Sequence, residues 1–173
     1  MPKDLTLEEG AKLCADFGMK LGGRLMDNGE LRFSMNAKSG AAYILTAMAT
    51  EQKGAWQNAH YHGGKLLSPG EPSLKMGIIE LILVESGWVA SADLMPNGER
   101  VIKMCKPGDV WISQPGIAHN IYQRGVTHCL KYGAPVGNHD AQRNGADWWP
   151  APKDFDDWTK SLSEDDIHRL VAA

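Results

Sequence analysis

The stretch Ala59-His60-Tyr61-His62 places two imidazoles two residues apart, between apolar and turn-forming residues. Successive side chains of a β-strand point to opposite faces, so His60 and His62 share one face and Tyr61 lies on the other. Two imidazoles on one face are either half of a metal site or a pair of exposed histidines on an edge strand. The rest of the chain must decide between these interpretations.

Length and composition exclude several classes of protein. The chain has 173 residues, about the size of one domain, and a net charge of -3 with scattered lysines and arginines, so we expect no nucleic-acid partner. It shows no signal-peptide pattern and no run near the ~20 apolar residues of a membrane span, so we expect a cytoplasmic protein with no membrane partner. Cys14, Cys105 and Cys129 are widely spaced and odd in number, which favours reduced thiols, with the latter two buried in strands.

Short apolar segments separated by glycine and proline turns fill the middle of the chain. We predict strands over residues 31–35, 42–48, 56–62, 78–84, 88–94, 100–104, 110–113, 118–122 and 127–132. The connections after Gly54 are too short for the crossover helices of a parallel α/β fold. The pattern therefore predicts an all-β sandwich or barrel.

Short helices are expected at both ends of this barrel. Thr6 and Glu9 have the spacing of a capping box, which predicts a first helix over about 7–17. Two further helices are expected near 155–162 and 163–171. We predict a single domain over 1–173, with a core barrel at about 31–132 and a tail at 133–173. Trp148 and Trp149 in this tail are expected to dock onto the barrel or a partner subunit, or to line a pocket mouth.

Two further polar residues interrupt apolar strands, namely Glu80 and His119. Burying a carboxylate or an imidazole costs several kcal/mol unless the group is paired or bound to a cation. Together with His60 and His62 they make three imidazoles and one carboxylate, a donor set suited to one divalent transition metal ion: Fe, Mn, Ni, Co or Zn. The alternatives are a buried lysine or arginine partner for Glu80 and a hydrogen-bonded core position for His119.

The spacing of these residues resembles the two characteristic motifs of the cupin superfamily, G-x5-HxH-x3-4-E-x6-G and G-x5-PxGxxH-x3-N. The resemblance covers roughly residues 43–132. The matched positions are Gly54, His60, His62, Glu80, Gly87, Gly108, Gly116 and His119. The resemblance implies a jelly-roll β-barrel with one metal ion inside, held by His60, His62, Glu80 and His119.

The chain departs from the cupin pattern in three places. Residues 63–79 separate His62 from Glu80 where the family has three or four, so a loop is inserted beside the site and Glu71 within it competes as the carboxylate ligand. Gln114 stands where the first proline of the second motif belongs, and Gln123 replaces its terminal asparagine. We favour Glu80 over Glu71 because Glu80 lies in an apolar strand six residues before a glycine.

The expected function is that of a metal-dependent enzyme acting on a small oxygenated metabolite, a sugar derivative or an oxo or hydroxy acid. The metal chelates substrate oxygens and Glu80 shuttles a proton, as in an isomerase, epimerase or lyase. A mononuclear Fe(II) dioxygenase and a non-catalytic ligand-binding cupin are the alternatives. Cupins pair through sheet edges and terminal segments, so the resemblance also implies a homodimer formed through the N-terminal strand or the tryptophan-bearing tail.

Overall fold

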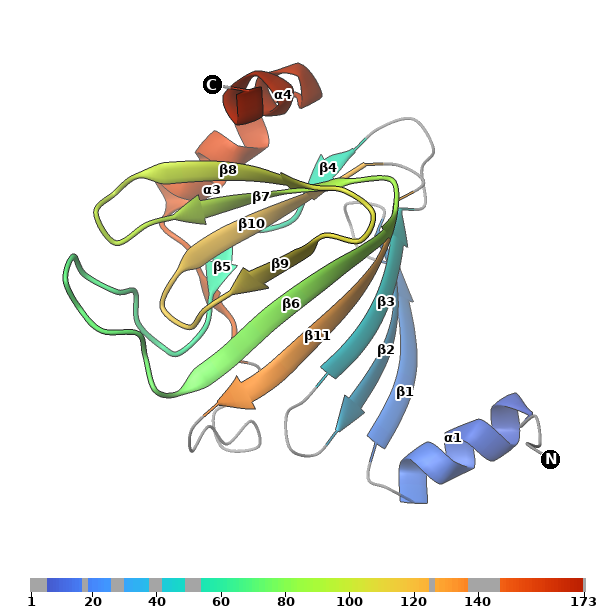
Figure 1. Cartoon of the computed structure of the whole chain (residues 1–173). Helices are drawn as coiled ribbons and strands as arrows, with labels where there is room; N and C mark the ends of the chain where they lie inside the picture. Colours follow the sequence, from blue (N-terminus) through green and yellow to red (C-terminus); the bar gives the residue numbers. More distant parts are fainter. Residues whose placement is uncertain are drawn as a thin grey trace.

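The chain folds into two antiparallel β-sheets that face each other, with helices at its two ends (Figure 1). The computed structural model describes residues 6–16, 19–25, 30–37, 42–48, 54–124, 127–136 and 147–172. Side-chain positions are described from residue 54 onward and for part of the first helix. For the strands before residue 54, only the backbone pairing is described.

The strands are divided between two sheets. In order across the first sheet come β1 (Met19–Leu25), β2 (Glu30–Ala37), β3 (Ala42–Met48), β11 (His128–Val136), β6 (Gly77–Ser86) and β9 (Val110–Ser113). The second sheet contains β12 (Trp149–Pro150), β5 (His60–Tyr61), β10 (Ala118–Gln123), β7 (Val89–Leu94) and β8 (Arg100–Cys105), with β4 (Ala55–Trp56) also paired to β10. The predicted all-β architecture is confirmed.

The central strands β7 and β10 of the second sheet are buried on both faces, and the sequence of β7 explains why. On β7, Ala90 and Ala92 point outward while Ser91 and Asp93 point between the sheets, and all four are buried. The apolar core between the sheets contains Ile82, Val84, Val89, Cys105, Trp111, Ile121 and Cys129. Both cysteines are buried in strands, as predicted.

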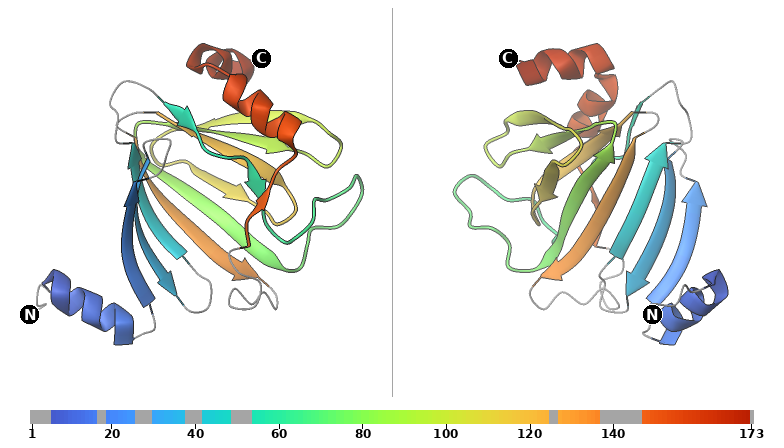
Figure 2. Two further views of the ribbon diagram at one scale, coloured as in Figure 1. Left: turned by 180° about the vertical axis from the view of Figure 1, so that it is seen from behind. Right: turned by 45° about the vertical axis from the view of Figure 1, so that its right-hand side comes forward.

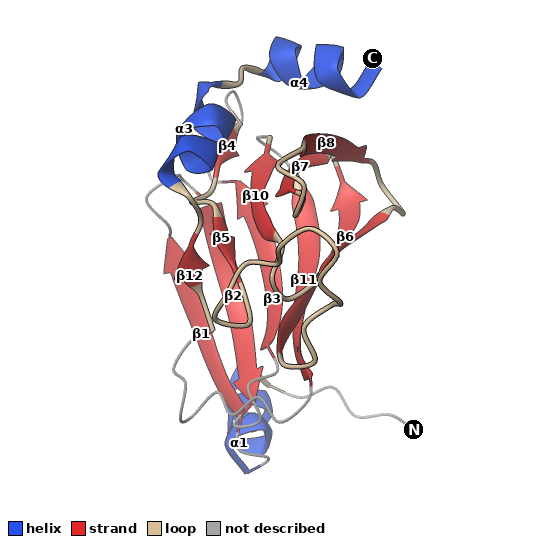
Figure 3. Ribbon diagram, turned by 90° about the vertical axis from the view of Figure 1, so that its left-hand side faces the viewer, coloured by secondary structure: helices blue, strands red, loops and turns tan. Residues whose placement is uncertain are grey.

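Two C-terminal helices cover the outer face of the second sheet. They are α3 (Lys153–Ser161) and α4 (Glu164–Ala172), and each places one fully buried apolar side chain, Phe155 and Ile167, against Trp56 and Tyr122. Burying a side chain of this size stabilises the fold by about 2–3 kcal/mol. The N-terminal helix α1 (Leu7–Asp16) lies at the opposite end of the molecule (Figure 3).

The predicted helix starts are confirmed at the level of hydrogen bonds. The Thr6 hydroxyl accepts from the Glu9 amide, and the Glu9 carboxylate accepts from the Thr6 amide, which completes the capping box. Ser163 and Asp166 make the same reciprocal pair ahead of α4. No helix within the described residues is long and apolar enough to span a membrane.

The structure corrects the prediction at three places. Residues 19–25 form strand β1, which the sequence did not predict, because seven paired positions with β2 outweigh the low strand propensity of Gly22 and Gly23. The segment 56–62 is not one strand but two strands of two residues, β4 and β5. β11 continues to Val136 beyond the predicted end of the barrel.

Candidate metal centre

Four side chains predicted as ligands meet in the space between the two sheets. They are His60 on β5, His62 just after it, Glu80 on β6 and His119 on β10. One nitrogen or oxygen atom from each lies within 4.8 Å of the corresponding atoms of the others. His119 is the backbone partner of His60 across the β5–β10 pair, while Glu80 reaches them from the facing sheet.

The Glu80 carboxylate lies in front of all three imidazoles. Its oxygens are 3.2 Å from Nε2 of His119, 3.6 Å from Nε2 of His62 and 3.8 Å from Nε2 of His60. The imidazole side chains are at most 8% exposed, whereas the Glu80 side chain is 30% exposed. Glu80 is therefore the member of the group that a molecule entering from solvent can reach.

Each imidazole is held through its other nitrogen, Nδ1. The Nδ1 atom of His60 lies 2.9 Å from the Asn58 carbonyl oxygen, and that of His62 contacts the Asp147 carbonyl oxygen. Nδ1 of His119 lies 3.1 Å from the Ile117 carbonyl oxygen and 2.8 Å from the Ser113 hydroxyl. A carbonyl oxygen can only accept a hydrogen bond, so the proton belongs on Nδ1 and the lone pair of the neutral ring on Nε2. All three rings present the liganding nitrogen to one point.

The electrostatics of the group favour a neutral His60 imidazole beside one ionised carboxylate. Burial, assisted by the nearby His119, lowers the pKa of His60 to about 3. Burial acts to raise the pKa of Glu80, but the facing imidazoles of His119 and His62 hold it well below its ordinary value. Burial acts to lower the pKa of His62, but the Glu80 carboxylate outweighs this effect, and the pKa is raised above its ordinary value. The protein therefore keeps a negative oxygen beside nitrogen donors.

This donor set fits a divalent transition metal ion. The Nε2 atom of His62 is buried and has no hydrogen-bond partner although it faces the other three groups. Leaving a buried polar atom unpaired costs about 1–3 kcal/mol, a cost that a bound cation removes. Imidazole nitrogens combined with a carboxylate are the ligands of Fe, Mn, Ni, Co and Zn sites.

The C-terminal tail holds the segment that carries His60 and His62. Because β4 and β5 have only two residues each, their own ladders provide few hydrogen bonds. The Ala59 amide donates to the Asp156 carboxylate (2.8 Å) and the Ala59 carbonyl accepts from the Ala151 amide (3.0 Å). β12 then pairs alongside β5, where the tail runs beside it (Figure 2).

Asp147 connects this tail directly to the ligands, and the sequence analysis did not identify it. Its carbonyl oxygen contacts His62, and both carboxylate oxygens accept from the Gly63 amide at 2.9 Å. The neighbouring Trp148 stacks on the His60 ring at 5.3 Å with its side chain half-exposed. The tail therefore docks onto the barrel, one of the roles expected from the sequence, and Trp148 packs against the proposed ligand His60.

The competing carboxylate, Glu71, lies elsewhere. It is partly exposed in the 63–79 loop, where it pairs with Lys65 at 3.0 Å and accepts from the Ser68 amide. This loop is anchored to the second motif by a hydrogen bond from the Leu67 amide to the Gly116 carbonyl oxygen (2.9 Å). Of the two carboxylates weighed from the sequence, only Glu80 joins the histidines.

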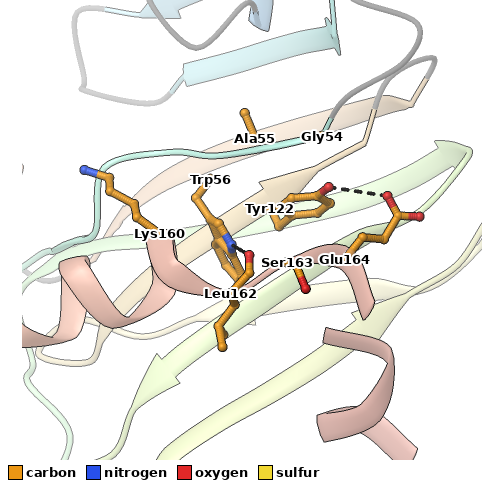
Figure 4. Close-up of a pocket in the computed structure, with 8 residues that line it drawn as sticks. All are labelled: Gly54, Ala55, Trp56, Tyr122, Lys160, Leu162, Ser163 and Glu164. Atoms are coloured by element: carbon orange, nitrogen blue, oxygen red, sulfur yellow. Dashed lines mark hydrogen bonds between the residues drawn. The ribbon is translucent and has the colours of Figure 1, made fainter. Parts of the chain in front are cut away.

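A separate hollow of about 320 Å³ lies on the outer side of the second sheet, between β4, β10 and the tail (Figure 4). Trp56 donates to the Leu162 carbonyl oxygen there, and the Tyr122 hydroxyl faces Glu164 at 3.4 Å. Tyr122, three residues after His119 on β10, lies on the opposite face of the strand. Gly54 is required at this point because a Cβ atom would lie 2.1 Å from the Tyr122 ring. The hollow thus lies where the tail contacts the barrel, and it is distinct from the metal centre.

Two facing antiparallel sheets with a His-His-Glu-His group between them agree with the jelly-roll barrel that the sequence motifs implied. Among solved structures, the chain is similar to the oxalate decarboxylase of Lactobacillus farciminis, with a TM-score of 0.51 and 16% identity over 87% of this chain and 41% of that chain. For the oxalate decarboxylase of Bacillus subtilis at pH 4.6, the TM-score is 0.53, with 13% identity over 87% of this chain and 37% of that chain.

KdgF from Halomonas sp. gives a TM-score of 0.46 and 12% identity over 77% of this chain and 89% of that chain. The chain spans about two fifths of the length of the decarboxylase chains it matches. The sequence matches no protein-family model and no curated protein. At these identities the likeness to solved structures is one of fold.

Proposed function

We propose that this protein is a metal-dependent cupin enzyme acting on a small oxygenated metabolite. The observation that carries the proposal is the convergence of three Nε2 atoms and the Glu80 carboxylate, with the three Nδ1 atoms each bound to a backbone carbonyl oxygen. His60, His62, Glu80 and His119 are the proposed ligands. A sugar derivative or an oxo or hydroxy acid fits such a site because adjacent oxygens can chelate a metal ion.

Glu80 is the proposed catalytic residue. A bound divalent ion supplies Lewis-acid polarisation of a substrate oxygen, which acidifies the neighbouring C–H group. Glu80 is the exposed member of the group and is ionised at neutral pH, so its carboxylate can take a proton from one substrate carbon and return it. The buried histidines keep their geometry during this transfer. This chemistry is that of an isomerase, an epimerase or a lyase.

Metal content tests the proposed ligands. We expect His60→Ala and His62→Ala each to lose bound metal, because one of four ligands is removed. His128→Ala is the matched control, since His128 is exposed on β11, away from the group. Elemental analysis of the purified variants measures the outcome. Full metal occupancy in either ligand variant would overturn the assignment.

Turnover tests the role of Glu80. We expect Glu80→Gln to abolish turnover of the substrate found in a screen of sugars and oxo acids, while metal content falls less than activity. Glu71→Gln is the control because that carboxylate pairs with Lys65 in the loop. Repeating the assay without dioxygen separates an isomerase or lyase from an Fe(II) dioxygenase with the same ligands. A metal-loaded protein that turns over nothing in the screen would indicate a binding protein.

A further inference from the structure

Two strongly exposed apolar side chains lie on β9, the edge strand of the first sheet. Val110 is 49% exposed and Ile112 is 56% exposed, whereas Trp111 and Ser113 on the same strand are buried. Because side chains alternate along a strand, Val110 and Ile112 lie on the outer face of the first sheet, the face that points away from the metal centre.

The strand pairing extends this outer face across β6 and β11. Leu83 and Leu81 of β6 are the partners of the two exposed β9 residues, and Leu130 and Tyr132 of β11 are their partners on the other side. All four are partly exposed although neighbouring strands flank them on both sides. The outer face is therefore apolar and open from β9 to the middle of the sheet.

The N-terminal strands continue the same face. Apolar and polar residues alternate along the whole of β2, and its register with β3 and β11 places the apolar set on the face of Leu130. The apolar set is Leu31, Phe33, Met35 and Ala37, and the polar set is Glu30, Arg32, Ser34 and Asn36. Such alternation is typical of a strand with one buried face and one face in water. The face that the sequence of β2 marks for burial is thus the outer face.

Within the described part of the chain, no helix lies across this face. Helix α1 lies at the end of β1, and α3 and α4 lie against the second sheet (Figure 1). Six strands about 4.8 Å apart, with about seven residues each rising about 3.3 Å, form a face of roughly 29 Å by 23 Å, or about 650 Å². Monomeric proteins rarely leave a continuous apolar patch larger than about 600 Å² in water.

We propose that the outer face of the first sheet is the interface through which two copies of this chain form a dimer. Two such faces together bury about 1,300 Å², within the range of about 1,200–2,000 Å² found for stable interfaces. Glu85 and His128 are the described residues of this face that can carry a charge near neutral pH, and both lie at the same end of the sheet.

The chemistry of the face favours a second copy over other partners. Its uncharged middle offers nothing to attract a nucleic acid or a charged lipid headgroup, whereas the same apolar face on another copy matches it. Two sheets pack face to face in this way in β-sandwiches, and a two-fold dimer is the commonest oligomer of identical chains. The tryptophan-bearing tail lies outside this interface.

Sedimentation of the full chain at micromolar concentration tests the proposal. We expect the wild type to sediment as a dimer of two 18.9 kDa chains. The dimer dissociation constant should rise at least a hundredfold in Leu130→Lys and in Ile112→Lys, because each variant buries an unpaired ammonium group in the interface. Leu170→Lys, on an α4 side chain that is 43% exposed, is the matched control and should remain dimeric.

A monomeric wild type overturns the proposal, and so does a dimer that withstands both interface variants. Trp149→Lys tests the tail, where this side chain is 45% exposed. If that variant dissociates the dimer while Leu130→Lys and Ile112→Lys do not, the tail is the interface and the proposal is wrong. Ile112 is already largely in water in one copy, so Ile112→Lys keeps the test decisive if Leu130→Lys fails to fold. Cooperative urea unfolding of a monomeric variant shows that it has dissociated rather than misfolded.

Discussion

Replacing Asp147 by alanine is expected to weaken metal binding although Asp147 is not a proposed ligand. Its carboxylate accepts the Gly63 amide with both oxygens at 2.9 Å, directly after His62. A hydrogen bond to a charged group contributes about 1.5–3 kcal/mol, and 1.4 kcal/mol corresponds to tenfold in affinity. If the metal-bound geometry depends fully on this contact, the dissociation constant rises ~10-fold to ~100-fold, the range typical of groups that orient metal ligands.

Competition between the protein and a chromophoric chelator for Co²⁺ measures this effect at pH 7.5, where the chelator reports free metal. Asp154→Ala is a matched control, because Asp154 also joins the tail to the barrel, through Arg100 at 2.8 Å, but does not touch the ligand segment. We expect its Co²⁺ affinity to stay within twofold of the wild type. If Asp147→Ala also stays within threefold, the Gly63 contact does not orient His62 and the reasoning is wrong.

Three further predictions concern stability, each measured by urea unfolding of the metal-free protein. The unfolding free energy should fall by up to about 1.4 kcal/mol per pH unit below pH 6.5, because the unfolded chain binds a proton at His60 that the folded chain, with a pKa of about 3, does not. Glu80, whose folded pKa is also low, acts in the same direction below pH 4.5. In His60→Gln, the unfolding free energy should fall less steeply on acidification than in the wild type. A wild-type unfolding free energy that rises on acidification would contradict the reasoning. Gly54→Ala should cost about 1–3 kcal/mol, because the new Cβ atom lies 2.1 Å from the Tyr122 ring, whereas Gly10→Ala, with open space around it, should not destabilise. Phe155→Ala should cost about 3–5 kcal/mol by leaving a cavity under α3, and a loss below 1 kcal/mol would show that the tail contributes little to the fold.

The barrel strands after residue 77 could be predicted to within a few residues because their apolar residues are bounded by glycine and proline turns. β1 could not, since Gly22 and Gly23 interrupt its pattern and only its pairing with β2 makes it a strand. The expectations of a homodimer and of a cytoplasmic location stay predictions. Helices α1 and α4 were predictable from their capping residues, which act locally.

The four proposed ligands were identifiable because each is a polar residue at a motif spacing, and the structure brings them together. Asp147 could not be identified from the sequence, because it lies 85 residues from His62. No local pattern marks its backbone carbonyl as the partner of that imidazole.

The dependence of the His60–His62 segment on the tail has a consequence for biosynthesis. During translation the imidazole pair leaves the ribosome well before Asp147, which is synthesised 85 residues after His62. Until then β5 lacks its β12 neighbour and His62 lacks the carbonyl that sets its tautomer. If the proposed ligands hold a metal ion, we therefore expect metal acquisition to follow synthesis of the tail.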